Sequence, residues 1–285
     1  MTEHPIALTT AVFPGAGSAH LYHAVDAGLF AGAGLDVTLH EVTSSQEQVA
    51  GWNDGTFSIL HTSPDHLLRG SLDRDATIVR AEAIGELSVY ARSGVALSDA
   101  RWAVDGAGSA FALVLRSVIA DLGGVDATAA TLEAVGGTPQ RLAAMLGGDA
   151  DGAVLHPPFD RVAEANGGFE RIGGHSDVVP ALMPVVVMVP GAELGSDMVT
   201  RYLETCERSA AALIEGGDEL LATALERRGW PAETARAVAP DILGPAGLGA
   251  DPHPSLEGLE AAARLRERWF PEWTPPPRLE QLLAR

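Results

Sequence analysis

The chain has 285 residues, 46% of them hydrophobic, and its 38 acidic and 19 basic residues give a formal net charge of −19. This length and composition are typical of a folded protein with two compact lobes, and they exclude an intrinsically disordered chain. Because a strongly negative surface repels phosphate groups and anionic lipid, we expect no nucleic acid partner. No apolar run is long enough for a membrane span, so we also expect no membrane insertion.

The first part of the chain alternates β-type runs with helical patterns. Strands are predicted at residues 5–13, 35–42 and 56–60. One helix is predicted to begin after Ser18, and another, after the second strand, to pass through Trp52. Strands that alternate with helices are typical of a parallel sheet covered by helices. We therefore predict a first α/β lobe here.

A second set of strand and helix patterns follows. Residues 76–84 and 87–94 are predicted strands that leave the first lobe, and a linker over residues 94–100 precedes the second. The clearest helical pattern of the chain begins after Ser109 and ends at two glycines. Further strands are predicted at residues 101–106, 131–135 and 151–155, with helices over residues 138–146 and from residue 157.

The C-terminal third is predicted to complete the first lobe. Residues 183–190 form a continuous apolar run bounded by proline, which is typical of a buried strand that returns the chain to that lobe. Helices are predicted over residues 198–215, 218–228, 232–238 and 256–269. The sequence thus predicts a two-lobed α/β protein with a ligand cleft between its lobes. Residues 1–90 and 188–285 would form lobe 1, and residues 91–187 lobe 2.

Short motifs in the first lobe carry a family resemblance. They are Gly28-Leu29-Phe30, Gly34-Leu35-Asp36-Val37 and Asn53-Asp54-Gly55, and looser matches follow over residues 102–111 and 149–161. With these motifs the chain resembles the SsuA/THI5-like group of type II periplasmic binding proteins over residues 1–190. The resemblance implies the two-lobed fold and a small solute in the cleft, since members bind sulfonates, nitrate, pyrimidines and other small molecules.

The candidate site can also be placed from the predicted strands. In open parallel sheets, ligands bind beyond the carboxyl ends of the strands, where helix N-termini present unpaired N–H groups. Loops in such positions cover residues 13–20, 61–65, 105–111, 136–138 and 156–160. The predicted ligand-binding residues are Phe13, Gly15, Ser18, His20, Thr62, Ser63, Glu82, Gly108, Ser109 and Phe111. Helix capping remains the alternative for the serines, core packing for the phenylalanines and solvent exposure for Glu82.

Two histidines are the predicted proton-transfer groups. His61 and His156 each follow a predicted strand directly, which favours exposure to the cleft. Asp105 and Asp160 flank two of the cleft loops, and they are the carboxylates predicted to orient the histidine rings. These four residues form the predicted catalytic set.

No cofactor or metal ion is expected. The chain contains no lysine, which excludes a Schiff-base cofactor. The glycine-rich loops over residues 13–20 and 105–111 lack the third glycine of a dinucleotide-binding fingerprint. His20 and His23 have the spacing of a chelating pair on a helix, but no third ligand stands near them in the sequence.

Two functions of different classes remain open. Residues 1–15 show no export signal and no lipid-attachable cysteine, so we expect a cytoplasmic protein. We therefore expect an intracellular enzyme of lyase or hydrolase type that acts on a small anionic or heteroaromatic molecule by acid–base or electrostatic chemistry. The alternative is the solute-binding protein of an ABC-type transporter, which would meet a permease only if it is exported.

Two enzyme relatives that the resemblance implies do not fit the residues present. The desulfinase of this group uses a nucleophilic cysteine in the first loop, and here that loop has none. The pyrimidine synthase uses a cysteine-rich motif and a lysine-bound cofactor, whereas Cys206 is the single cysteine of this chain. Thiol chemistry of either kind is therefore not expected.

Overall fold

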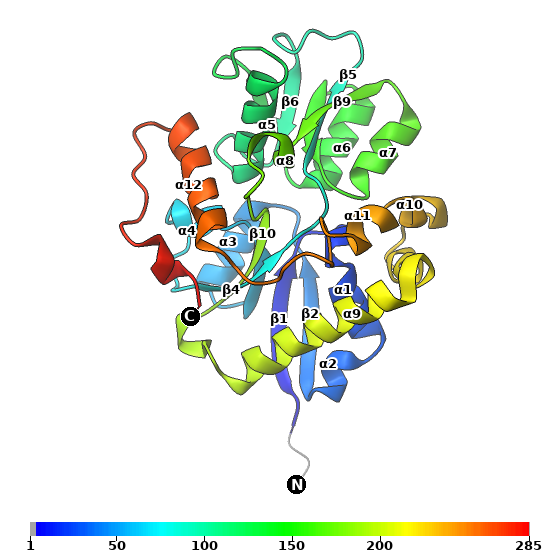
Figure 1. Cartoon of the computed structure of the whole chain (residues 1–285), viewed down its shortest axis with the longest axis vertical. Coiled ribbons are helices and arrows are strands. Elements are labelled where there is room, and N and C mark those ends of the chain that lie inside the picture. The colour runs from blue at the N-terminus through cyan, green and yellow to red at the C-terminus, as the bar shows by residue number, and fades with distance from the viewer. Residues whose placement is uncertain (1–3, 285) are drawn as a thin grey trace.

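Two five-stranded sheets organise the computed structural model, which describes residues 4–284 (Figure 1). The first sheet has the order β2-β1-β3-β10-β4, in which β1 pairs in parallel with β2 and β3, and β10 runs antiparallel to β3 and β4. Its strands are β1 (Ile6–Val12), β2 (Leu35–Glu41), β3 (Ile59–Thr62), β4 (Thr77–Glu82) and β10 (Val185–Val189).

The second sheet repeats this pattern. Its order is β7-β6-β8-β5-β9, with β6 parallel to β7 and β8, and β5 antiparallel to β8 and β9. Its strands are β5 (Ser88–Arg92), β6 (Arg101–Val104), β7 (Thr131–Ala134), β8 (Gly152–Leu155) and β9 (Phe169–Gly174). The chain changes sheets after β4 and returns in β10, as the apolar run over residues 183–190 predicts.

Helices around the first sheet bury its apolar side chains. The packing joins α1 to the long helix α9, where Leu21, Phe30 and Tyr202 belong to one buried cluster. Two helices were predicted over residues 198–215 and 218–228, and the span of α9 does contain a non-helical break between them at Gly217, whose φ of 63° glycine adopts readily. The helices of this lobe are α1 (Ala19–Asp26), α2 (Leu29–Gly32), α3 (Ser45–Asn53), α4 (Asp65–Leu68), α9 (Asp197–Glu226), α10 (Ala232–Ala237) and α11 (Ala239–Leu243).

The second sheet carries helices that begin at its strand ends. Ser109 caps the predicted helix α5, since its hydroxyl accepts a hydrogen bond from the Ala112 N–H at 3.1 Å. The apolar side chains of α5 pack into the largest core cluster. The helices here are α5 (Ala110–Asp121), α6 (Thr138–Gly147), α7 (Phe159–Asn166) and α8 (His175–Val178).

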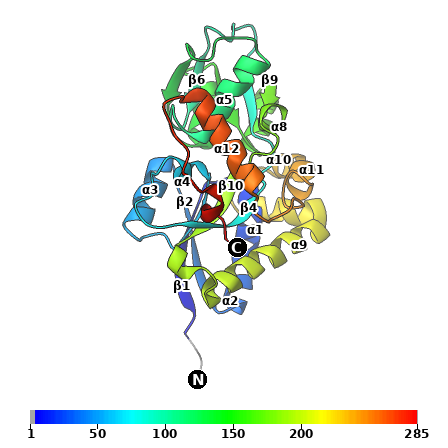
Figure 2. The same cartoon turned by 60° about the vertical axis from the view of Figure 1, so that its left-hand side comes forward.

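The helix α12 (Leu256–Trp269) touches both lobes. It was predicted to pack on the first lobe, and it does contact α4 there, but it also packs along α5 of the second (Figures 1 and 2). Trp269 Nε1 donates to Ser117 Oγ at 2.9 Å, and Arg268 forms a bidentate ion pair with Asp121. Among the described residues, no helix is both long and apolar enough to cross a membrane.

Candidate functional site

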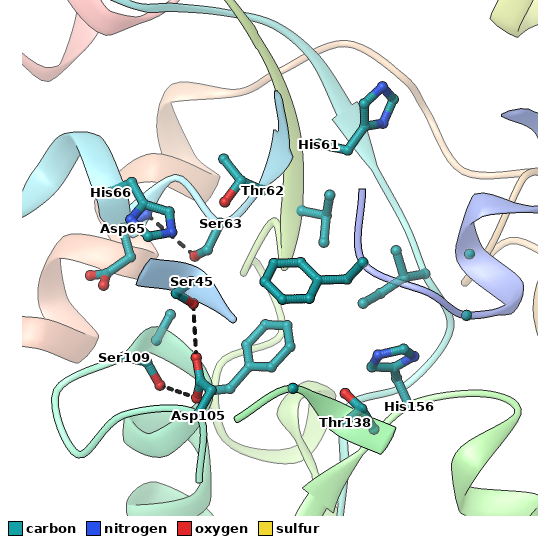
Figure 3. Close-up of a pocket in the computed structure, with 18 of the residues that line it drawn as sticks. Ser45, His61, Thr62, Ser63, Asp65, His66, Asp105, Ser109, Thr138 and His156 are labelled. Carbon is teal, nitrogen blue, oxygen red and sulfur yellow. Dashed lines mark hydrogen bonds between the residues drawn. The ribbon is translucent and has the colours of Figure 1, made fainter. Parts of the chain in front are cut away.

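A cleft between the two lobes is lined by residues of both (Figure 3). The space that protein atoms leave free there is about 790 Å³, part of it open to solvent. Every one of the five loops predicted from strand ends contributes to the lining. The predicted site residues that line it are Phe13, Gly15, Ser18, His61, Thr62, Ser63, Glu82, Asp105, Ser109, Phe111 and His156.

Three predicted site residues lie outside this lining. His20 is buried in α1 behind the cleft, where its ring contacts Glu82. The Gly108 carbonyl accepts a hydrogen bond from Arg266 on α12. Asp160 is buried in α7, where its carboxylate accepts the Arg161 N–H at 2.7 Å. Burial raises the pKa of Asp160 to about 6, in spite of the neighbouring Arg161.

The predicted pairing of an aspartate with a histidine is not what the structure shows. Among residues 4–284, no hydrogen bond joins Asp105 or Asp160 to His61 or His156. The carboxylate beside His61 belongs to Glu82, which β4 carries into the same region from the first lobe. The difference arises because β3 and β4 belong to one sheet, on either side of β10, and bring Glu82 close to His61, whereas Asp105 follows β6 of the other sheet.

Asp105 is held by two serines from opposite lobes. Ser109 of the second lobe donates to its Oδ1 at 2.5 Å, and Ser45 of the first donates to its Oδ2 at 3.2 Å (Figure 3). The Arg141 guanidinium lies 4.0 Å from the same carboxylate. Asp105 therefore acts as an acceptor that joins the lobes across the cleft.

Arg141 is a buried cation of the cleft that sequence reasoning missed. It is 1% exposed, and it donates to Thr138 Oγ1 at 2.7 Å and to the carbonyls of Val154 and Gly136. A signal was present, since an arginine near the start of α6 opposes the helix dipole, which favours acidic residues there. Such a residue suggests a role outside the helix itself.

Asp65 and Arg266 form a second buried pair at the cleft. Arg266 Nε and Nη2 donate to the two carboxylate oxygens of Asp65 at 2.6 and 2.7 Å, and Nη2 also reaches the Gly108 carbonyl at 2.6 Å. Asp65 lies in the first turn of α4, where the helix dipole favours a carboxylate. Nothing local predicted a partner 201 positions away in the sequence.

His156 and His66 line the cleft, and both have a lowered pKa. Burial, reinforced by Arg141, lowers the pKa of His156 to about 4, although its bond to the Pro157 carbonyl opposes the shift. Because a carbonyl only accepts, the Nδ1–H of His156 must donate to it at 3.0 Å, which leaves Nε2 as an acceptor. Burial, with Arg69 and Arg266 nearby, lowers the pKa of His66 to about 3.

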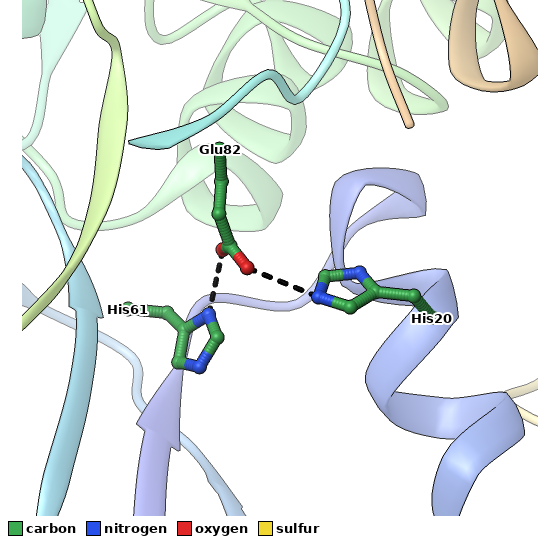
Figure 4. Close-up of side chains that lie close together, drawn as sticks. All are labelled: His20, His61 and Glu82. Atoms are coloured by element: carbon green, nitrogen blue, oxygen red, sulfur yellow. Dashed lines mark hydrogen bonds and ion pairs between the residues drawn. The ribbon is translucent and has the colours of Figure 1, made fainter. Parts of the chain in front are cut away.

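His61 belongs to a buried polar network (Figure 4). Its Nδ1 lies 2.6 Å from Glu82 Oε2 and its Nε2 lies 2.8 Å from Tyr202 Oη, while His20 Nε2 lies 3.0 Å from Glu82 Oε1. Burial opposes ionisation of Glu82, but the two histidines outweigh it and hold its pKa well below the usual range. Glu82 was predicted as a ligand-binding residue with solvent exposure as the alternative, and the structure leaves only 9% of it exposed.

The walls of the cleft are apolar and its arginines are paired. Phe13, Ile84, Phe111 and Val185 supply apolar surface. The arginines that line it already have acidic or polar partners, because Arg141 faces Asp105 and Arg69 donates to His66. The cleft thus combines apolar walls with polar groups from both lobes, the usual make-up of a small-molecule site.

Comparisons with known proteins address the fold. No protein-family model and no curated protein matches the sequence. The solved structures that match include the ligand-binding component of an ABC-type import system from Staphylococcus aureus with zinc bound, at 13% identity and a TM-score of 0.78, over 98% of this chain and 96% of that one.

Two further structures have named ligand classes. The alkanesulfonate-binding protein SsuA from Xanthomonas axonopodis pv. citri, bound to MOPS, is 15% identical with a TM-score of 0.75 over 100% of both chains. The nitrate-binding protein NrtA from Synechocystis PCC 6803 is 12% identical with a TM-score of 0.76, over 98% of this chain and 85% of that one. Because each likeness spans both lobes, it confirms the predicted fold: the chain has the SsuA-like type II periplasmic-binding-protein fold, two α/β lobes that face each other across a cleft.

Proposed function

We propose that this chain is a binding protein that encloses one small organic molecule between its lobes, as the substrate-binding component of an ABC-type importer. The observation that carries the proposal is the cleft itself, whose apolar walls and polar groups come from both lobes. A molecule in this position contacts Phe13 of one lobe and Phe111 of the other, so binding favours the closed arrangement of the lobes.

The geometry of the histidines favours binding over acid–base catalysis. Both ring nitrogens of His61 have partners within 2.8 Å, and His156 is held by a backbone carbonyl. The single thiol, Cys206, is buried in α9 outside the cleft lining, and burial raises its pKa. The expected lyase or hydrolase activity therefore finds no support in the arrangement of these groups.

The direct test is a thermal-shift screen of small carboxylates, sulfonates, sulfinates and heteroaromatic compounds, preceded by native mass spectrometry of the purified protein. A bound ligand at 100 times its Kd stabilises the native state by about 2.7 kcal/mol, which a melting curve resolves. We expect a hit that is recovered unchanged after incubation. Chemical conversion of the hit would instead make the protein an enzyme.

The location of the hit is tested with aromatic truncations. Phe13→Ala and Phe111→Ala should each weaken binding, because each removes apolar wall from a different lobe. Leu194→Ala, at a leucine 47% exposed on the surface, is the matched control and should leave binding unchanged. Equal affinity in all three variants would place the ligand outside the cleft.

The importer role adds a requirement of location. Delivery to a permease needs the protein outside the cytoplasm, whereas a cytoplasmic protein would bind its ligand inside the cell. Fractionation of cells that express the native gene, followed by immunoblotting, separates the two. Recovery in the cytoplasmic fraction alone would exclude the importer role and leave the binding role in place.

A further inference from the structure

Three side chains from three elements of the first lobe lie close together (Figure 4). His20 comes from α1, while His61 and Glu82 come from β3 and β4, and they are 2%, 3% and 9% exposed. One ligand atom of each residue lies within 4.8 Å of the others, namely the two imidazole nitrogens and a carboxylate oxygen. The fold therefore brings together groups that no sequence spacing joins.

These groups form a metal-ligand set of recognisable chemistry. Two imidazole nitrogens and one carboxylate oxygen suit zinc and similar divalent transition metals, with bonds of about 2.0–2.2 Å. The nitrogens of His20 and His61 already lie 3.0 and 2.6 Å from Glu82 oxygens, which is close to the spacing between ligands of one ion. The two nitrogens face different oxygens of Glu82, so coordination of one ion requires the side chains to turn toward a common point.

The proton balance of binding can be stated from the hydrogen bonds. Without an ion, His20 Nε2–H and His61 Nδ1–H donate to Glu82. An ion needs the lone pairs of these nitrogens, so each neutral ring moves its proton to its other nitrogen, and a ring that carries two protons releases one. The moved proton of His61 then donates from Nε2 to Tyr202 Oη, which lies 2.8 Å away.

Tyr202 thus holds the place of an outer-shell partner. Histidines that bind metals almost always donate their second N–H to such a group, which fixes the ring. Tyr202 is fully buried and stacks on Phe30, with 5.2 Å between ring centroids, so its hydroxyl has a fixed position. The positive charge of Arg80 disfavours an ion here, because its Nε lies 3.9 Å from Glu82. Part of that charge is offset by Glu207, which lies 3.2 Å from Arg80 Nη1.

Access to the cluster comes from the cleft. His61 and Glu82 both line it, whereas His20 lies behind them. Three protein ligands with a remaining position open to a cavity are typical of zinc sites that bind a water molecule or a ligand. A divalent ion here would keep a net positive charge after binding the single Glu82 carboxylate, whereas the arginines that line the cleft, Arg69 and Arg141, already have partners.

We propose that His20, His61 and Glu82 form a site for a divalent transition metal of the Zn²⁺ class at the floor of the cleft, with an open coordination position that takes an anionic group of a cleft ligand. The site goes beyond the binding function proposed above. It rests on the cluster alone and is tested with the metal alone, so either proposal can fail without the other.

The first experiment titrates the apo protein, prepared with a chelator, with Co²⁺ followed by absorption spectroscopy and with Zn²⁺ by calorimetry. We expect one ion per chain. His20→Gln, His61→Gln and Glu82→Gln should each weaken binding by at least about 100-fold, since loss of an outer-shell partner alone costs about 10- to 100-fold. Tyr202→Phe should weaken it by about tenfold.

A matched control is available elsewhere in the chain. His175 Nδ1 lies 2.6 Å from Glu86, a histidine–glutamate pair in which no second histidine takes part, so His175→Gln should leave affinity unchanged. Equal affinity in the three ligand variants and the control would overturn the site. If the ligand variants do not fold, X-ray absorption of the Zn²⁺-loaded wild type decides, since the proposal requires two imidazoles around the ion and fails with fewer.

Discussion

His61 and His156 occupy matching places in the two lobes. Each stands where a strand meets the cleft, His61 within the end of β3 and His156 directly after β8. Yet His61 contacts Glu82 and Tyr202 through side chains, whereas His156 bonds only to the backbone carbonyl of its neighbour. The position after a strand brings a histidine to the cleft, but partners from distant parts of the chain decide its chemistry.

The largest expected effect is at His61. His61→Ala leaves the buried Glu82 carboxylate without one of its two imidazole partners, and breaking a buried pair in this way costs about 3–5 kcal/mol. Urea denaturation measures the loss. The control is His40→Ala, since His40 is an exposed partner of Glu47 and such pairs contribute about 0–1 kcal/mol. Equal losses in the two variants would show that the buried pair of His61 and Glu82 contributes no more stability than an exposed pair.

A pH profile tests His156. Its pKa is about 4 in the folded protein and 6.5 in the unfolded chain, so between these values the unfolded chain binds more protons. Stability therefore decreases as the pH falls from 6.5 to 4, by up to about 3 kcal/mol for this one group. In His156→Gln this part of the pH dependence should disappear. If the unfolding free energy, measured by urea denaturation, varies with pH in the same way in the variant and the wild type, the pKa of His156 is not lowered in the folded protein.

Gly15→Ala probes the packing around His156. An added Cβ would lie 2.6 Å from Cε1 of the ring and 3.1 Å from Nδ1, so the imidazole must move. We expect a loss of about 1–3 kcal/mol, the usual cost of overpacking, together with a shifted NMR resonance of the ring. Gly106→Ala is the control, because nothing lies within 4 Å of its added Cβ. An unperturbed His156 resonance would contradict the contact.

The smallest expected effect is at Tyr202. Tyr202→Phe keeps the ring that stacks on Phe30 and removes only the hydroxyl that bonds to His61. The unfolding free energy should decrease by about 1 kcal/mol, as for one hydrogen bond. Urea denaturation of Tyr202→Phe and His61→Ala under the same conditions shows how much of the stability lost in His61→Ala comes from the bond to the Tyr202 hydroxyl. A loss in Tyr202→Phe as large as that in His61→Ala would reverse the order expected here.

Much of the fold follows from local sequence signals. The apolar run of β10, the Ser109 cap of α5 and the helical pattern of α12 each predicted an element at the place where the structure has it. The strand β9 was not predicted, because its sequence FERIGG has only one strongly apolar side chain between its ends. Such a strand is specified by its pairing with β5, which is a tertiary contact.

The candidate site divides in the same way. Loops at strand ends were predictable, since the direction of the strands decides where they gather. Pairs such as Asp65 with Arg266 and His20 with Glu82 were not, because each joins residues that are far apart in the sequence. His20 and His23 were considered together as neighbours on a helix, whereas the structure pairs His20 with Glu82 and turns His23 to Ser209.

The contacts of Arg266 also set an order of assembly. All strands of both sheets are complete by Val189, and α12 follows only at residues 256–269. During synthesis, each sheet can form before the arginine that joins Asp65 of one lobe to the Gly108 carbonyl of the other has left the ribosome. Until then the guanidinium nearest to Asp65 is that of Arg69, whose Nε lies 3.8 Å from its carboxylate. The contact of Arg266 with both lobes is thus among the last interlobe contacts that the growing chain can form.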